Sequence, residues 1–202
     1  MAGVLDGIRV LDFGRFIAGP FAATILGDLG ADVIRIERID GGEDRWTVPV
    51  TTDGQGALFL QVGRNKKSVT LNPMKDEGRE IMNNLIKTAD IVVANLPPET
   101  RKQMGLDYPA LKAIKSDLIV STVTCFGSGG PFSDRVGFDG LAQAMSGAMY
   151  MTGPEGQPTR NSTPYVDFCT GSLLSMATLA ALRHRDLTGE GQELEGALLK
   201  TA

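Results

Sequence analysis

The sequence contains little histidine and little cysteine. Its 202 residues include one histidine, His184, and two cysteines, Cys125 and Cys169, which form no Cys-x-x-Cys motif. His184 falls near the end of a predicted helix, where a cation interacts favourably with the helix dipole, so we expect a surface role. Cys169 lies about four turns before it, more than about 20 Å away, so the two cannot form a nucleophile–base pair. We expect reduced thiols, no Ser-His-Asp triad and no metal site.

Long apolar runs and strong charge of one sign are also missing. No apolar run approaches the about 20 residues of a membrane-spanning helix, and the N-terminus lacks the basic start of a secretory signal. The net charge is −4, and the densest basic cluster is Arg64, Lys66 and Lys67. That cluster is too small to bind a phosphate backbone. These features predict a cytoplasmic protein that binds neither nucleic acid nor a membrane.

Apolar segments of strand and helix character alternate along the chain. Strands are predicted at 8–13, 33–37, 68–71, 90–94, 118–123 and 192–195. Helices are predicted at 20–29, 75–88, 106–114, 139–147, 166–185 and 196–202. Alternating strands and helices build parallel sheets, because each crossover helix returns the chain to the same edge. The pattern therefore predicts an α/β fold with a Rossmann-like, doubly wound parallel sheet.

The last predicted helix begins near the end of the chain and has no stop signal. We therefore expect residues 1–202 to be a piece of a longer protein, although a closed small domain remains the alternative.

The first predicted strand is followed by a turn that does not fit dinucleotide binding. Gly14 and Gly19 lack the GxGxxG spacing that admits a pyrophosphate, although Glu37 ends the second strand where a ribose-binding acid would stand. No GxxxxGK[ST] motif is present either. A nicotinamide enzyme or an NTPase is therefore disfavoured.

Asp167 is the strongest candidate for chemistry, at the start of the long helix predicted at 166–185. An acid at this position commonly caps the free amides of the helix. The same helix N-terminus would keep the carboxylate ionised, and an ionised carboxylate is a nucleophile at neutral pH. Gly171, one turn later, leaves space for a large ligand to approach the backbone. These residues alone leave both interpretations open.

Five segments, in order along the chain, resemble family III CoA transferases. They are LDGIRVLD at 5–12, AGP at 18–20, LGADVIRIER at 29–38, NKKS at 65–68 and TGEGQ at 188–192. The family contains formyl-CoA transferase, carnitine CoA-transferase and α-methylacyl-CoA racemase. Each segment is weak alone, but together they are specific. The resemblance identifies residues 1–202 as the N-terminal part of a CoA-binding large domain, without the family's small C-terminal domain.

The resemblance implies that Asp167 is a covalent nucleophile. It would attack an acyl-CoA thioester to form an aspartyl anhydride, then an aspartyl-CoA thioester, from which a carboxylic acid takes over the CoA. CoA and acyl-CoA are then substrates, and no permanently bound cofactor is expected. The resemblance also implies an interlocked homodimer.

The resemblance further assigns CoA-binding residues, mostly in loops that follow predicted strands. They are Ile17, Ala18, Arg38, Leu71, Asn72, Met74, Asn95, Pro97, Arg101 and Gln103. Three positions depart from the family pattern. Gln103 replaces an arginine of many relatives, which leaves Arg101 for the phosphates, and Met74 replaces a lysine of some. Ile17 replaces the glutamine of formyl-CoA members, which disfavours that substrate pair.

Phe138 and Asp139 are expected in the substrate pocket. The racemase branch carries Gly-His-Asp where this chain has Gly137, Phe138 and Asp139. Without the imidazole, exchange of the α-proton between two bases loses one partner. The sequence therefore favours a transferase, with a racemase or isomerase and a non-catalytic fragment as alternatives.

Overall fold

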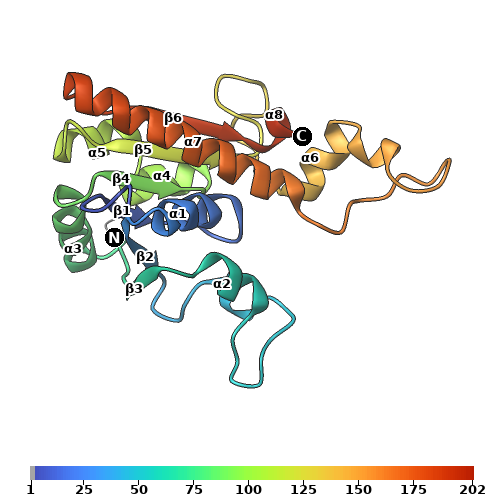
Figure 1. Ribbon diagram of the computed structural model, residues 1–202, viewed down its shortest axis with the longest axis horizontal. Helices are drawn as coiled ribbons and strands as arrows, with labels where there is room; N and C mark the ends of the chain where they lie inside the picture. The colour runs from blue at the N-terminus through green and yellow to red at the C-terminus, as the bar shows by residue number, and fades with distance from the viewer. Residues whose placement is uncertain (1–2) are drawn as a thin grey trace.

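A six-stranded sheet forms the centre of the protein, in a computed structural model that describes residues 3–202. Every strand pairs in parallel with its neighbours, in the order β3-β2-β1-β4-β5-β6 (Figure 1). The strands are β1 (Arg9–Asp12), β2 (Asp32–Glu37), β3 (Lys66–Thr70), β4 (Ile91–Ala94), β5 (Ile119–Thr124) and β6 (Glu193–Ala197). The predicted α/β fold with a doubly wound parallel sheet is confirmed, and the chain order reverses between β1 and β4.

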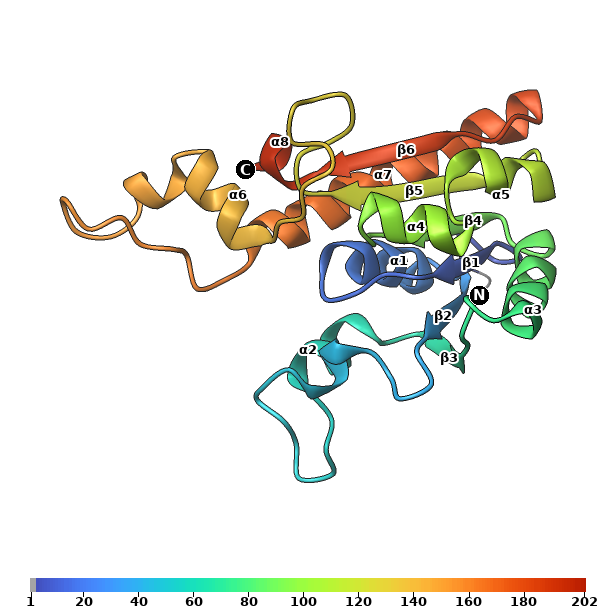
Figure 2. The same cartoon turned by 180° about the vertical axis from the view of Figure 1, so that it is seen from behind.

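Helices cover both faces of this sheet. Helices α1 (Ala18–Asp28) and α7 (Tyr165–Thr188) lie on one face (Figure 1), and α3 (Asp76–Lys87), α4 (Pro98–Met104) and α5 (Tyr108–Ile114) lie on the other (Figure 2). The remaining helical segments are α2 (Ala57–Val62), α6 (Asp139–Met145), α8 (Leu198–Thr201) and the 3₁₀ turns Glu43–Trp46 and Ala148–Met151. Helix α4 was not predicted, although Pro98 suits the first turn of a helix.

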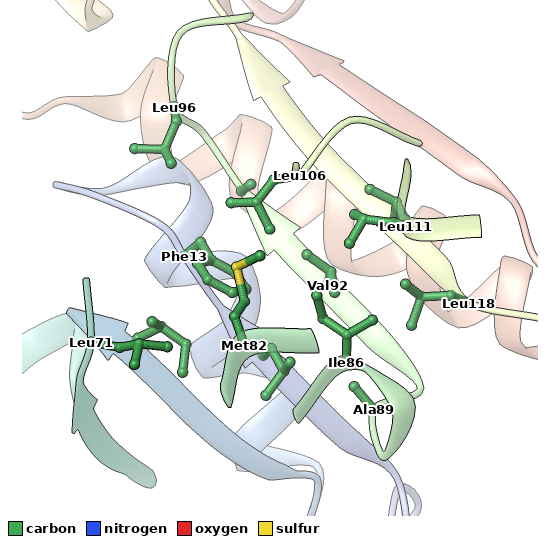
Figure 3. Packing of buried hydrophobic residues seen from close by; sticks show 14 residues of the cluster. Phe13, Leu71, Met82, Ile86, Ala89, Val92, Leu96, Leu106, Leu111 and Leu118 are labelled. Atoms are coloured by element: carbon green, nitrogen blue, oxygen red, sulfur yellow. The ribbon is translucent and has the colours of Figure 1, made fainter. Parts of the chain in front are cut away.

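The larger core cluster lies between the sheet and the helices α3 and α5. Met82 and Ile86 of α3 pack with Leu111 of α5 and Val92 of β4 (Figure 3), and none of the four is more than 1% exposed. Burying each such side chain contributes about 1.5–3 kcal/mol. This packing holds β4, whose last residues lead into the site described below.

Helix α7 corrects the expectation that no segment has the length of a membrane span. By length and composition alone, its 24 residues could cross a membrane. An 18-residue stretch of the helix has a mean hydropathy of 1.3, and 44% of that stretch is buried inside the protein. In the structure this helix packs on β5, where Thr178 and Ser121 share a buried hydrogen bond of 2.8 Å. A side chain at Gly171 would lie 2.7 Å from the carbonyl oxygen of Ala18. The missing side chain at Gly171 thus admits α1, not a ligand as predicted.

A buried ion pair joins β3 to the end of β1. Lys66 Nζ lies 2.7 Å from Asp12 Oδ2, and their side chains are 2% and 0% exposed. Lys66 also donates to the carbonyl of Pro20 in α1, while Asp12 Oδ1 accepts from the Gly14 amide. Burial lowers the pKa of Lys66, and the neighbouring Asp12 opposes that change. The pair therefore fixes the loop after β1 to the sheet.

We expect Lys66→Met to lower the free energy of unfolding by about 3–5 kcal/mol, because it leaves the buried Asp12 carboxylate without its cationic partner. Denaturant unfolding at neutral pH measures the change. Lys67→Met is the matched control. Its side chain is 73% exposed and pairs with Asp32 at the surface, so the expected loss is below about 1 kcal/mol. Equal losses in the two variants would contradict the proposed importance of the buried pair.

Candidate active site

A cavity of about 230 Å³ opens at the carboxyl edge of the sheet. The loops after β1 (residues 15–18) and β4 (residues 95–98) form one side, and the end of β5 (residues 123–125) and residues 135–138 form another. Asp167 of α7 and Leu198 of α8 complete the lining. Strands β1 and β4 flank the point where the strand order reverses, which is where open α/β sheets bind ligands.

The first turn of α7 is capped by Asp139, which comes from α6. Asp139 Oδ2 accepts hydrogen bonds from the backbone amides of Val166 at 2.9 Å and Asp167 at 3.3 Å. The residue at the cap position of α7 itself, Pro164, has no side-chain acceptor. Throughout residues 3–202, no hydrogen bond to the Asp167 carboxylate is found. Its side chain lines the cavity, so the cap interpretation of Asp167 does not hold.

Asp139 is held in turn by Gln143. Gln143 Nε2 donates to Asp139 Oδ1, and Gln143 Oε1 accepts from the backbone amide of Asn161 at 2.9 Å. Both residues are buried, with Asp139 4% exposed and Gln143 1% exposed. The sequence placed Asp139 in the substrate pocket, but the structure buries it behind the first turn of α7. A carboxylate is favourable there, because the free amides at a helix N-terminus attract an anion.

The ionisation of Asp167 also differs from the expectation. Burial, and then the charge of Asp139, raise the pKa of Asp167 to about 7. The helix N-terminus does not keep it fully ionised, because burial and the nearby Asp139 carboxylate disfavour the charged form. Near pH 7 about half of the molecules carry the charged form. Burial and the charge of Asp167 in turn raise the pKa of the Cys125 thiol.

The structure gathers about half of the predicted ligand residues at this cavity. Ile17, Ala18, Asn95, Pro97 and Phe138 line it together with Asp167. With Asp167, these residues come from four separate stretches of sequence. The site therefore depends on the parallel register of the sheet.

The other predicted residues lie outside the cavity. Arg38 is largely exposed and pairs with Asp40 at 2.9 Å, and Leu71 belongs to the core. Asn72 accepts from the backbone amide of Met74, whose side chain is 57% exposed.

Arg101 and Gln103 lie on α4, just beyond the β4 loop. Arg101 Nε is buried without a partner in the described residues, and Gln103 donates to Glu99. None of these positions contacts the cavity, so their role in CoA binding stays a prediction.

Several lining residues were not predicted from the sequence. Arg15 and Phe16 adjoin the predicted Ile17, while Cys125 and Arg135 come from the end of β5 and the loop beyond it. The only available signal was their position just after strands. Among residues 3–202, no cluster of His, Cys, Asp and Glu could hold a metal ion.

Known proteins identify the class to which this fold and site belong. A family model described as CoA-transferase family III matches residues 5–202. The chain is 41% identical to the succinyl-CoA–L-malate CoA-transferase beta subunit of Chloroflexus aurantiacus, over 98% of this chain and 49% of that protein. It is 40% identical to the succinyl-CoA:glutarate CoA-transferase of Mus musculus, over 98% of this chain and 46% of that protein. The chain therefore belongs to CoA-transferase family III.

Solved structures agree with this membership. A CAIB/BAIF family protein from Brucella suis superposes with a TM-score of 0.94 and 37% identity, over 100% of this chain and 55% of that one. The chain spans about half the length of the curated relatives it matches.

Asp167→Asn should make the folded state more stable at high pH. An unfolded aspartate ionises near pH 3.9, whereas Asp167 in the folded state does so at about 7. Between these values the folded state retains a proton that the unfolded state loses, so the stability contributed by this group falls as pH rises. Asparagine has no proton to lose, and we expect it to be more stable by about 2–4 kcal/mol at pH 8. Denaturant unfolding at pH 4 and pH 8 measures the difference, and a pH-independent gap contradicts the raised pKa.

Proposed function

We propose that the protein containing this chain transfers coenzyme A from an acyl-CoA thioester to a free carboxylic acid, with Asp167 as the nucleophile. One observation carries the proposal. The Asp167 carboxylate lines the cavity at the strand-order reversal, and the capping role expected of it is taken by Asp139. Asp167 is half-buried, and a partly desolvated carboxylate that forms no ion pair costs stability, so a chemical role explains its presence.

The proposed reaction begins when a carboxylate oxygen of Asp167 attacks the thioester carbonyl and expels CoA thiolate. The product is a mixed anhydride between Asp167 and the acyl group. The thiolate then attacks the Asp167 carbon of the anhydride, which releases the donor acid and leaves an aspartyl-CoA thioester. The acceptor carboxylate repeats the two steps in reverse and restores Asp167. Covalent capture replaces one difficult exchange by easier steps and preserves the thioester.

The surroundings of Asp167 suit this chemistry. A pKa of about 7 keeps a large ionised fraction at neutral pH and makes that carboxylate more basic than an exposed one. Apolar side chains, including Ile17, Phe138 and Leu198, line the cavity. Water would hydrolyse both the anhydride and the thioester, so its exclusion is necessary for transfer.

We propose succinyl-CoA as the donor and a dicarboxylic acid as the acceptor. The similar proteins from Chloroflexus aurantiacus and Mus musculus are named as succinyl-CoA transferases. The guanidinium group of Arg135 at the cavity also favours anionic substrates, whereas that of Arg15 is already paired with Glu43. Ile17 disfavours the formyl-CoA pair, as the sequence indicates.

A racemase is less well supported. Phe138 replaces the imidazole that the second base would need, and its ring packs edge-on against Phe16 at 5.5 Å. Asp139 cannot serve as that base either, because it is buried and accepts bonds from two amides and from Gln143.

The rest of the CoA molecule would follow the carboxyl edge of the sheet. Arg38 follows β2, and Leu71, Asn72 and Met74 follow β3; these two strands continue the sheet from β1 on the side away from β4. We also propose that residues 1–202 are the N-terminal part of a large domain, completed by a small domain in a cytoplasmic homodimer. The length of the relatives supports this arrangement.

Incubation with succinyl-CoA should leave a covalent adduct on Asp167. Hydroxylamine converts the activated carboxyl to a hydroxamate and borohydride reduces it to an alcohol, and peptide mass spectrometry locates either product. Asp167→Ala should abolish the modification, whereas Asp186→Ala, at the exposed end of α7, should retain it. A racemase would instead exchange the α-hydrogen for deuterium without an adduct. A full-length protein that shows neither reaction contradicts catalysis at Asp167.

The rate of adduct formation should rise with pH by about tenfold per unit up to a midpoint near 7, since only the ionised Asp167 attacks. Asp139→Asn should move this midpoint to lower pH, because it removes a negative charge beside Asp167 and keeps an oxygen for the α7 amides. Asp134→Asn, on the exposed loop before α6, is the control and should leave the midpoint in place. An unchanged midpoint in Asp139→Asn contradicts the charge coupling.

A further inference from the structure

The side chain of Asn95 is bonded to the backbone of another loop. Asn95 Oδ1 accepts from the Arg15 amide at 2.6 Å, and Asn95 Nδ2 donates to the Arg15 carbonyl at 2.7 Å. The two residues follow β4 and β1, which are neighbours in the sheet. One side chain thus continues the pairing of the two strands beyond their ends. Its remaining capacity is one lone pair and one N–H.

The residue after Arg15 has a backbone conformation that needs such support. Phe16 has φ of 59°, in the left-handed region that side chains with a Cβ rarely adopt. This conformation persists only where surrounding contacts enforce it. One residue before Arg15, the loop is also fixed by the bond from the Gly14 amide to Asp12. Asn95 is therefore the contact that fixes the chain directly before the strained residue.

The strained loop forms the wall of the cavity that holds Asp167. Arg15, Phe16, Ile17 and Ala18 all line it. Helix α1 begins at Ala18, and α1 packs on α7 through the close contact at Gly171. A change in the loop backbone would therefore change the distance between this wall and the substrate carbonyl. Misplacement of about 1 Å reduces reaction rates by about 100-fold.

We propose that Asn95 is a positioning residue: it holds residues 15–18 in the strained form that shapes the wall facing Asp167. This proposal rests on the proposed function for its kinetic consequence. It differs from a direct CoA contact, because both functional groups of Asn95 already bond to Arg15.

Asn95→Ala in the full-length protein tests the proposal. We expect the rate of adduct formation at Asp167 to fall by about 10- to 100-fold, while the dissociation constant for CoA changes by less than about twofold. Asn84→Ala is the matched control, because Asn84 is exposed on α3 and bonds only to Lys87. If CoA binding weakens by the same factor as the rate, Asn95 is a ligand and the proposal is wrong.

A rescue experiment separates positioning from a general loss of structure. Glycine adopts a positive φ without strain. Asn95→Ala should therefore lower the rate by a smaller factor in a Phe16→Gly background than in the wild type, although Phe16→Gly alone should lower the rate by removing a lining ring. Equal factors in the two backgrounds contradict the proposed role of the strain. Asn95→Asp, which keeps the volume and the acceptor but removes the donor, is the second variant if Asn95→Ala does not fold, and it should give a smaller loss.

Amide hydrogen exchange provides a readout that does not depend on activity. Exchange at residues 15–18 should be at least about tenfold faster in Asn95→Ala than in wild type, since the Arg15 amide loses its acceptor. Exchange in α3 should be unchanged. Unaltered exchange at residues 15–18 overturns the proposal, even if the wild-type protein forms no adduct and the proposed function fails.

Discussion

The bond between the Asp139 carboxylate and the first amides of α7 is the constraint on which the site depends. It provides the free helix N-terminus with an anion, which would otherwise have to come from the acid in the first turn, Asp167. Gln143 keeps Asp139 in place from within the same helix. Because the anion comes from elsewhere in the chain, Asp167 can present its carboxylate to the cavity. A local cap would have removed this carboxylate from the cavity.

The close contact between α1 and α7 fixes the Asp167 carboxylate relative to the opposite wall of the cavity. Gly171 lets the Ala18 carbonyl approach α7, and the rings of Phe21 and Phe168 meet edge-on at 4.8 Å beside it. Both helices begin at the cavity, so a contact within their first turns fixes the positions of Ala18 and Asp167 together. The helix pair therefore determines the width of the site, while the sheet determines where its loops lie.

The sequence could predict the sheet because its four central strands are short runs rich in apolar residues between turn residues, and all six predicted strands overlap the observed ones. It could also predict Asp167 and the loops after β1 and β4, from the resemblance and the rule for parallel sheets. The role of Asp139 could not be predicted, because its partners are 27 and 28 residues away. Neither could the bonds from Asn95 to Arg15, since a contact between loops leaves no periodic signal. The sequence does not predict helix α4, because the Pro97-Pro98 pair is typical of a loop.

Two carboxylates show how desolvation serves different purposes. Asp12 is fully buried but meets Lys66 and the Gly14 amide, so its charge is compensated and it organises the loop. Asp167 is half-buried, has no such partner among residues 3–202 and lies near a second carboxylate, so its charge is disfavoured and its pKa rises to about 7. Pairing Asp167 with a cation would stabilise the fold, but it would also hold the lone pairs that must attack a carbonyl. An uncompensated carboxylate beside a cavity is therefore what a covalent role for Asp167 requires, and the paired Asp12 shows that the fold can neutralise a buried acid where no reaction takes place.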